Sequence, residues 1–398
     1  MSEETPIITS LLDTDKYKFS MQQINFHQYP KAIAKYRFKC RNQGIDLRPI
    51  AGRLREQFRM LAQLRFADSE LRYLSKEDHL TGDYIDFLSD FSLDDRHIHV
   101  SVNADGLDIW AEGPMLKTSG WELYVLAILN EVWFQETVKE PNYDEGRRRL
   151  MDKIDLIKTY GEDGLAGFNF TDFGTRRRFS KDWQDEVLRT LKLELGERYL
   201  TGTSNYYFAR EHKLKPIGTM AHEYLQAWQG MVHPLDAQKA ALDGWAEEFR
   251  GRLGDALTDV IGMDSFCEIL DLYFAKQFDG FRHDSGDPVV WGNKLIVRLD
   301  ELGIDTHTKR AIWSDGLDVE TMIKLYQTFR GRIQTGFGWG TNLTNDLGYK
   351  PLNIVMKLIE LNGRSVAKLS DSPGKGMCED PQYMQWLANS YGRAEEFR

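Results

Sequence analysis

The sequence is poor in cysteine. Its three cysteines, among 398 residues, are scattered as Cys40, Cys267 and Cys378 and form no CxxC pair. An odd and scattered set of this kind excludes a disulfide framework and a cysteine-based metal site. Such a low cysteine content is typical of proteins in a reducing compartment.

Long apolar runs are absent as well. None approaches the roughly 18 residues that a membrane-spanning helix requires. The first residues, Met1-Ser2-Glu3-Glu4, lack the basic start and the apolar core of a signal peptide. We therefore expect a soluble, cytoplasmic protein with no membrane partner.

Positive charge is in short supply. The chain carries 51 Lys and Arg against 61 Asp and Glu, which gives a net charge of −10. Proteins that bind nucleic acid need a basic face to neutralise phosphates, so nucleic acid is not the expected partner. The run from Arg176 to Arg178 is a local exception, and a solvated surface run is its ordinary interpretation.

What the chain does have is enough apolar material for a large core. Hydrophobic residues make up 41% of it and aromatic residues 12%. This composition excludes a disordered protein, and the length favours two domains.

From about residue 165, short apolar strand candidates alternate with amphipathic helices. Alternation of this kind predicts a parallel sheet with right-handed crossovers, most economically an α/β barrel. The strand candidates are 168–172, 199–203, 214–218, 254–259, 279–282, 310–314 and 331–335.

Both ends of the chain have an antiparallel pattern instead. Residues 97–110 predict a hairpin around Asp105-Gly106, and residues 352–369 predict a second one around Asn362-Gly363. We expect the second hairpin to rejoin the amino-terminal sheet. The predicted fold is therefore α/β: a discontinuous α+β sheet domain of residues 1–120 plus 350–398, and an irregular α/β barrel of residues 121–349.

Polar motifs follow the predicted strands. The carboxyl ends of parallel strands meet on one face, where active sites of such folds lie. The motifs are Asp172–Phe179, Gly202–Asn205, Gly218–Tyr224, Arg282–Pro288, Ser314–Asp318 and Gly336–Thr341.

His222 lies where a predicted strand gives way to a helical pattern. A histidine there can carry a proton, bind an anion or act as a nucleophile toward phosphorus. A capping or core histidine is the ordinary alternative, and only the neighbouring motifs favour chemistry.

Together with Leu11–Lys18, these motifs resemble the bacterial nicotinate phosphoribosyltransferase family over nearly the whole chain. The resemblance implies type II phosphoribosyltransferase architecture and a step of NAD salvage. Nicotinate, phosphoribosyl pyrophosphate, ATP and water would give nicotinate mononucleotide, pyrophosphate, ADP and phosphate. The sequence has no Walker A motif, so ATP use does not follow from a nucleotide-binding motif and is implied only by the resemblance. The resemblance implies that ATP is a co-substrate and phosphorylates His222 transiently.

The resemblance also implies partners and an assembly. Mg²⁺ would enter with the pyrophosphate and phosphates, and no separate set of metal ligands is expected; His97 and His99 lack a third ligand. The family forms a homodimer in which the segment around Asp15 and Tyr17 reaches the neighbour's active site.

The chemistry assigns roles to several residues. Asp284 would stabilise the positive charge that develops on the ribose, and Arg282 would pair with the nicotinate carboxylate. The expected catalytic residues are His222 and Asp284. The expected substrate-binding residues are Asp15, Tyr17, Asp172, Phe173, Thr175, Arg176, Thr203, Arg282, Ser285, Asp315, Gly316, Gly338, Gly340 and Thr341.

Some alternatives stay open. The spacing does not decide which of Arg176, Arg177 and Arg178 contacts substrate. A phosphosugar aldolase or isomerase would share the barrel and the phosphate loops, but it would use a Schiff-base lysine or a carboxylate base at a strand end. A catalytically silent sensor of NAD precursors would have lost His222 or Asp284, and both are present.

Overall fold

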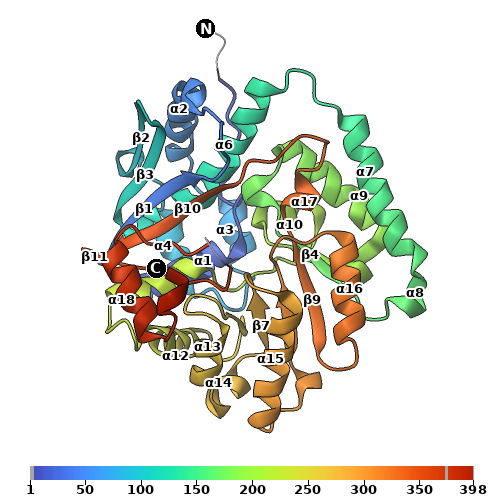
Figure 1. The fold of residues 1–398 in the computed structure, drawn as a ribbon. Helices are drawn as coiled ribbons and strands as arrows, with labels where there is room; N and C mark the ends of the chain where they lie inside the picture. The colour runs from blue at the N-terminus through green and yellow to red at the C-terminus, as the bar shows by residue number, and fades with distance from the viewer. Residues whose placement is uncertain (1–3, 373–374, 398) are drawn as a thin grey trace. The chain divides into compact units, whose positions relative to one another are not determined.

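The computed structural model describes residues 4–372 and 375–397 (Figure 1). The chain divides into two compact units. The first unit comprises Met1–Gly164, Phe170–Gly218 and Trp339–Lys357, and the second unit comprises Leu165–Asn169, Thr219–Gly338 and Leu358–Arg398. These units are regions of dense internal packing. The predicted domain boundaries, 1–120 plus 350–398 and 121–349, stay a prediction.

The first unit contains an antiparallel sheet. Its strands are β1 (Ile33–Cys40), β2 (Ile98–Asn103), β3 (Gly106–Pro114) and the start of β10 (Ile354–Leu361), in the order β10-β1-β3-β2. Asn103 pairs with Gly106, so β2 and β3 form the predicted hairpin with Ala104-Asp105 as its turn. Gly106 has a φ of 137°, which only glycine adopts readily.

The second predicted hairpin is also confirmed. β10 pairs with β11 (Arg364–Ser365) through Glu360 and Ser365. Asn362 and Gly363 form the turn with φ values of 52° and 77°, in the left-handed region that such turns require. Because β10 borders β1, this segment joins the amino-terminal sheet as predicted.

Helices make up most of the rest of the first unit. Helix α6 is buried on nearly all sides, because its sequence is apolar around the whole circumference. The helices are α1 (Lys16–Gln28), α2 (Ala51–Ala62), α3 (Asp68–Leu74), α4 (Gly82–Ser89), α5 (Met115–Thr118), α6 (Trp121–Thr137), α7 (Tyr143–Thr159), α8 (Gly161–Gly164), α9 (Lys181–Tyr199), α10 (Tyr206–His212) and α17 (Thr341–Thr344). The unit also holds the parallel pair β4 (Phe170–Asp172) and β5 (Leu200–Thr203).

The second unit is built on parallel strands. Its strands are β6 (Asp255–Leu257), β7 (Gly280–His283), β8 (Arg310–Trp313) and most of β9 (Gln334–Trp339). They pair in the order β6-β7-β8-β9 with parallel register. Phe281, Ala311 and Trp313 on these strands are fully buried. The alternation of strands and helices read from the sequence is therefore confirmed here.

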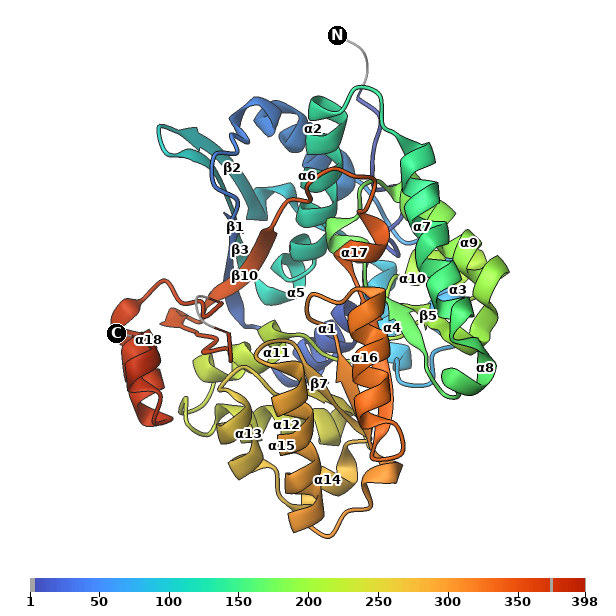
Figure 2. The same ribbon diagram turned by 45° about the vertical axis from the view of Figure 1, so that its right-hand side comes forward.

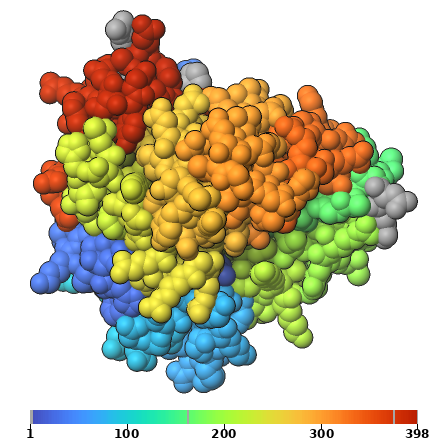
Figure 3. Space-filling model, turned by 90° about the horizontal axis from the view of Figure 1, so that it is seen from below, coloured from blue at the N-terminus to red at the C-terminus, as the bar shows by residue number. Residues whose placement is uncertain are grey.

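Helices cover this parallel sheet. α13 and α15 lie side by side, as do α15 and α16 (Figure 2). Seen from below, segments from about residue 250 to 330, coloured yellow to orange, occupy the centre of the face (Figure 3). The helices of the second unit are α11 (His222–Ala227), α12 (Ala237–Phe249), α13 (Met263–Ile269), α14 (Leu272–Gln277), α15 (Pro288–Glu301), α16 (Val319–Phe329) and α18 (Pro381–Ser390), of which α18 packs against Ala367 and Leu369.

One predicted strand is wrong. Residues 214–218 form no strand; a single bridge joins Thr203 to Pro216. The bridge is made by the carbonyl of Lys215 and the N–H of Ile217. Pro216, between them, has no N–H to offer to a further strand on its other side, so the segment does not extend the sheet. Within residues 4–372 and 375–397, no helix combines the length and the apolar character needed to cross a membrane.

Candidate active site

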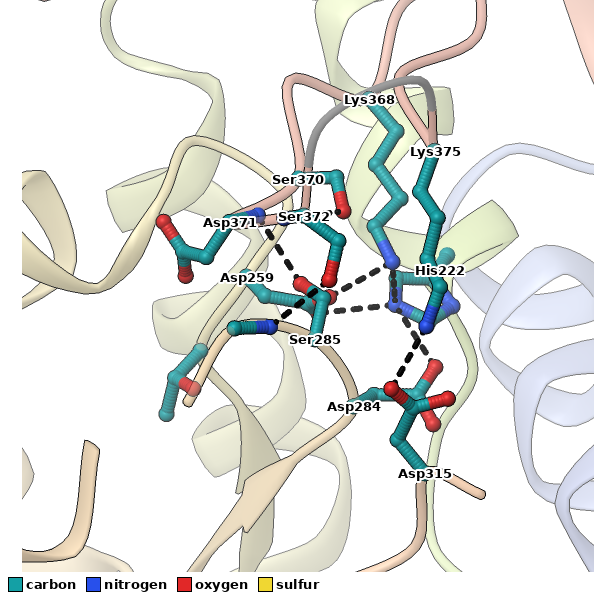
Figure 4. Close-up of polar contacts among 12 residues, drawn as sticks. His222, Asp259, Asp284, Ser285, Asp315, Lys368, Ser370, Asp371, Ser372 and Lys375 are labelled. Carbon is teal, nitrogen blue, oxygen red and sulfur yellow. Dashed lines mark hydrogen bonds and ion pairs between the residues drawn. The ribbon is translucent and has the colours of Figure 1, made fainter. Parts of the chain in front are cut away.

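The second unit gathers carboxylates at one edge of its sheet. Asp259 lies two residues beyond β6, Asp284 directly follows β7, and Asp315 comes two residues after β8. Parallel strands end at the same edge, so the three side chains come from neighbouring positions (Figure 4). The predicted residues Asp284, Ser285 and Asp315 are thus brought together, and Asp259 joins them.

His222 is the first residue of α11 and points into this cluster (Figure 4). Its Nε2 atom lies 2.8 Å from Asp259 Oδ1 and 3.4 Å from Asp284 Oδ2. The side chain is 7% exposed. No described residue hydrogen-bonds to Nδ1, and Figure 4 shows the second ring nitrogen on the side away from Asp259. His222 is therefore part of a polar network and does not cap the helix.

Lys368 completes the network. Its Nζ atom lies 2.6 Å from Asp259 Oδ2 and 2.8 Å from His222 Nε2. The residue follows β11, and its side chain is 10% exposed. Lys368 is not among the residues predicted from the sequence, although a lysine between Ala367 and Leu369, in an apolar stretch, is a signal that could have indicated it.

The network does not fit a resident metal ion. His222, Asp259 and Asp284 each offer a ligand atom, and these atoms lie within 4.8 Å of one another. Lys368, however, already places an ammonium against both His222 and Asp259. A divalent cation bound by the same atoms would face this positive charge at close range. The chemistry of the donor set therefore favours the ammonium as the cation of the site.

Burial and charge act on the titration of the three groups. Burial lowers the pKa of His222, and Lys368 lowers it further. Burial alone would raise the pKa of Asp259, but Lys368 and His222 outweigh it and hold that pKa well below its ordinary value. The pKa of Asp284 is lowered in the same way: His222 and Lys368 overcome its burial. The site thus holds two carboxylates and a neutral imidazole near neutral pH.

Ser285 ties this network to the carboxyl-terminal segment. Its Oγ donates to Asp259 Oδ2 at 2.5 Å and accepts from the backbone N–H of Asp371 at 2.9 Å. The N–H of Gly286 donates to Ser372 Oγ at 2.9 Å. Gly286 has a φ of 85°, and an added Cβ would lie 3.0 Å from Asp371 Cβ, so glycine is required.

The remaining predicted residues of the second unit have mixed surroundings. Asp315 forms an ion pair with Lys375 at 2.6 Å. Gly316 has a φ of 63° and open space around its Cα, as a close backbone approach to a phosphate would need. Arg282 has a buried Nε atom without a hydrogen-bond acceptor among the described residues. Gly338 is buried near the end of β9.

The first unit contains a separate polar cluster at the ends of β4 and β5. The carboxylate of Asp172 accepts hydrogen bonds from Thr203 Oγ1 at 2.7 Å, Gln184 Nε2 at 2.8 Å and the N–H of Gly174 at 2.8 Å. Burial raises the pKa of Asp172 to about 6, although these donors favour the ionised form. Asp172 and Thr203, predicted from strand ends, therefore interact directly.

Asp15 belongs to the same cluster. Its Oδ1 accepts from Ser204 Oγ at 2.7 Å, and burial raises its pKa. Thr175 is buried, and its Oγ1 accepts from Asn205 Nδ2 at 3.2 Å. Tyr17 lies half-buried on α1.

The structure distinguishes the three arginines. Arg178 is fully buried in an ion pair with Asp13, and Arg177 Nε donates to Ile354 O at 3.0 Å. Arg176 is partly exposed and influences the titration of Asp15. Arg177 and Arg178 thus have partners within the protein, and which of the three arginines contacts substrate stays a prediction.

A close approach that requires glycine brings the 172–176 loop next to α17. An added Cβ at Gly174 would lie 2.2 Å from two atoms of Thr344, so only glycine fits there. Phe173 donates its N–H to Trp339 O at 2.8 Å, and Gly340 lies close to Phe173 O. Gly340 and Thr341 therefore lie beside the loop predicted to hold the pyridine ring.

Comparison with known proteins covers nearly the whole chain. The family model for the amino-terminal domain of nicotinate phosphoribosyltransferase matches residues 12–130, and the model for the nicotinate phosphoribosyltransferase family matches residues 168–395. The nicotinate phosphoribosyltransferase of Burkholderia mallei is 51% identical over 390 residues, covering 97% of each chain. That of Cupriavidus necator is 50% identical over 389 residues, covering 97% of this chain and 98% of its own.

Solved structures agree with these matches. The nicotinate phosphoribosyltransferase of Vibrio cholerae has a TM-score of 0.94 and 39% identity, over 97% of this chain and 94% of its own. That of Porphyromonas gingivalis has a TM-score of 0.92 and 35% identity, over 97% and 100%. The α/β fold class and the type II phosphoribosyltransferase architecture are confirmed. The chain belongs to the nicotinate phosphoribosyltransferase family.

Proposed function

We propose that this protein transfers the phosphoribosyl group of phosphoribosyl pyrophosphate to nicotinate, and that ATP drives the reaction through a phosphorylated His222. The products are nicotinate mononucleotide, pyrophosphate, ADP and phosphate, as in NAD salvage. The observation that carries the proposal is the placement of His222 among Asp259, Asp284 and Lys368, with Nε2 engaged and Nδ1 without a hydrogen bond from the described residues.

The transfer step needs positioning and charge and no enzyme nucleophile at the sugar. The bond from ribose C1 to pyrophosphate breaks through an oxocarbenium-like state, and the pyridine nitrogen then bonds to C1. Asp284 stays ionised because its pKa is lowered, so it can stabilise the positive charge on the sugar. Arg282 offers an unsatisfied buried N–H for the nicotinate carboxylate.

The pyridine ring is assigned to the cluster of the first unit. Phe173 provides an aromatic face, Arg176 provides a positive charge, and Asp172, Asp15, Tyr17, Thr175 and Thr203 form the polar surroundings. The glycines Gly316, Gly338 and Gly340, with Asp315, Ser285 and Thr341, are assigned to the sugar and its phosphates.

The phosphoryl step uses the free ring nitrogen. The Nδ1 lone pair attacks the γ-phosphorus of ATP, the P–Nδ1 bond forms, and ADP leaves with the electrons of the P–O bond. The Nε2 proton stays between the ring and Asp259, which balances the charge of the phosphorylated imidazole. Mg²⁺ arrives with the phosphates of its substrates. We further propose a cytoplasmic homodimer with shared active sites.

Two measurements on purified protein test the proposal. Nicotinate mononucleotide should form from nicotinate and phosphoribosyl pyrophosphate, and ATP with Mg²⁺ should accelerate its formation. Protein incubated with γ-labelled ATP should carry acid-labile, base-stable label, as phosphohistidine does.

The variant His222→Asn separates the two steps. Asparagine is similar in size but cannot accept a phosphoryl group. The variant should form product slowly, carry no label and show no acceleration by ATP, whereas Asp284→Ala should lose the transfer step itself. Label that survives in His222→Asn would refute the phosphorylation of His222, and wild-type protein that forms no product would refute the transfer.

A further inference from the structure

One nitrogen of His222 faces two partners. Nε2 lies 2.8 Å from Asp259 Oδ1 and 2.8 Å from Lys368 Nζ. A ring nitrogen makes one in-plane hydrogen bond: it donates when it carries a proton and accepts when it carries a lone pair. Nε2 therefore cannot donate to Asp259 and accept from Lys368 at the same time, and one contact is electrostatic only.

The other contacts of Lys368 and Asp259 decide which bond forms. Lys368 Nζ lies closer to Asp259 Oδ2, at 2.6 Å, than to the ring. Ser285 Oγ also donates to Oδ2, at 2.5 Å. An ammonium prefers a charged carboxylate over a neutral nitrogen as its acceptor. Because Lys368 and Ser285 both donate to Asp259 Oδ2, Asp259 Oδ1 is left to accept the proton of His222 Nε2. His222 Nδ1 then keeps its lone pair.

Charge reinforces this arrangement. The charged groups facing His222 are Asp259 after β6, Asp284 after β7 and Lys368 after β11. Farther from the ring, Asp315 forms an ion pair with Lys375, and the charge of Arg282 interacts with that of Asp284. Asp371 interacts electrostatically with Asp259 and forms an ion pair with Arg393. Two carboxylates alone would favour a positively charged ring. The ammonium of Lys368 offsets one of them and lies against the ring itself.

We propose that Lys368 is a positioning residue that acts through Asp259 to hold His222 as a neutral imidazole with its proton on Nε2, so that Nδ1 is free to accept a phosphoryl group. The inference rests on the proposed phosphorylation of His222 only for its last clause. The state of the ring can be measured without ATP.

Protein labelled with ¹⁵N and ¹³C in histidine provides the direct test. The His222 signals are those missing from His222→Asn, and the ¹⁵N shifts report which nitrogen carries the proton. In wild-type protein the ring should stay neutral, with a proton on Nε2, from pH 8 down to about pH 6. In Lys368→Met the ring should take up its second proton at least about one pH unit higher, a tenfold change in proton affinity.

Matched variants separate charge from packing. Lys309 is also buried, but it directly precedes β8 and therefore lies at the opposite edge of the sheet. Its Nζ donates to Phe278 O. Lys309→Met should leave the His222 signals as in wild type. Lys368→Arg keeps the charge and should restore the neutral ring. If Lys368→Met does not fold, Lys368→Gln against Lys368→Arg makes the same comparison.

Labelling by γ-labelled ATP adds a second measurement. When the pH falls from 8 to 6, the labelling rate of Lys368→Met should drop by a factor about ten times larger than the factor for wild type or for Lys309→Met. His222 signals or labelling profiles that do not differ between Lys368→Met and wild type would overturn the inference, as would a wild-type ring with its proton on Nδ1. If the NMR signals show the expected ring states but wild-type protein takes up no label from ATP, the role of Lys368 is supported and the proposed phosphorylation is refuted.

Discussion

Arg178 and Asp13 form a bidentate ion pair in which neither side chain is exposed. The two nitrogen–oxygen distances are 2.7 and 2.8 Å. Asn205 donates to the same carboxylate at 2.8 Å. Burial alone would raise the pKa of Asp13, but Arg178 outweighs it and the net shift is downward. This pairing gives Arg178 a structural partner within the protein.

Breaking this pair should destabilise the protein strongly. Asp13→Ala leaves a buried guanidinium without its partner, which costs about 3–5 kcal/mol of the free energy of unfolding. A double-mutant cycle compares wild type with Asp13→Leu, Arg178→Met and the double variant that carries both. The double variant should lose much less free energy of unfolding than the sum of the losses of the two single variants. Thermal and denaturant unfolding of the four proteins measures the coupling, and additive losses would contradict a direct interaction.

Glu131 should make stability depend on pH. Burial raises its pKa from 4.5 to about 7, against the opposing effect of Arg178. Between these values the folded protein binds more protons than the unfolded chain, so the contribution of Glu131 to the free energy of unfolding falls as pH rises.

The glutamine of Glu131→Gln cannot ionise. Between pH 5 and pH 8 the free energy of unfolding of this variant should therefore fall by about 1–3 kcal/mol less than that of wild type. Melting temperatures across this range measure the difference. Glu136→Gln, on the same helix with an exposed side chain, is the control and should follow wild type. A wild-type slope in Glu131→Gln would show that Glu131 ionises normally.

Arg282 should set the preference for the acid over the amide. A buried cation without its carboxylate partner costs about 1–3 kcal/mol, so Arg282→Ala should raise the KM for nicotinate roughly 5- to 150-fold. The KM for phosphoribosyl pyrophosphate should change far less. Arg310→Ala, at the other end of a neighbouring strand, serves as the control. Equal changes in both KM values would reject this assignment.

The proposed homodimer with shared active sites predicts that two inactive variants can complement each other. Tyr17→Ala and Asp284→Ala should each be inactive as homodimers, because every site then lacks one group. After subunit exchange, a mixed dimer contains one intact composite site and should recover part of the activity. Exchange can be followed with differently tagged subunits. Exchanged dimers that stay inactive would argue that Tyr17 serves the site of its own subunit.

Local patterns in the sequence determined much of the fold. The turns at Asp105 and Asn362 depend on residues that interact with near neighbours. The strands from β6 to β9 were indicated by short apolar runs that alternate with helical patterns. The same holds for Asp284 and Asp315, since a polar residue after a buried strand marks the active edge of a parallel sheet. Asp259 obeys this rule too and could have been found by it. The strand predicted at 214–218 is wrong: the segment makes a single bridge, and Pro216 has no N–H to offer to a further strand on its other side.

The pairings that define the clusters were decided only by the tertiary structure. Lys368 meets His222 across 146 positions of sequence, and Arg178 meets Asp13 across 165. No periodicity or spacing encodes such contacts, because they depend on which strand ends and loops the packed core brings together. The sequence could supply three adjacent arginines and a lysine in an apolar stretch. Burial and the position of a distant carboxylate decided which of these charges is structural and which one faces His222.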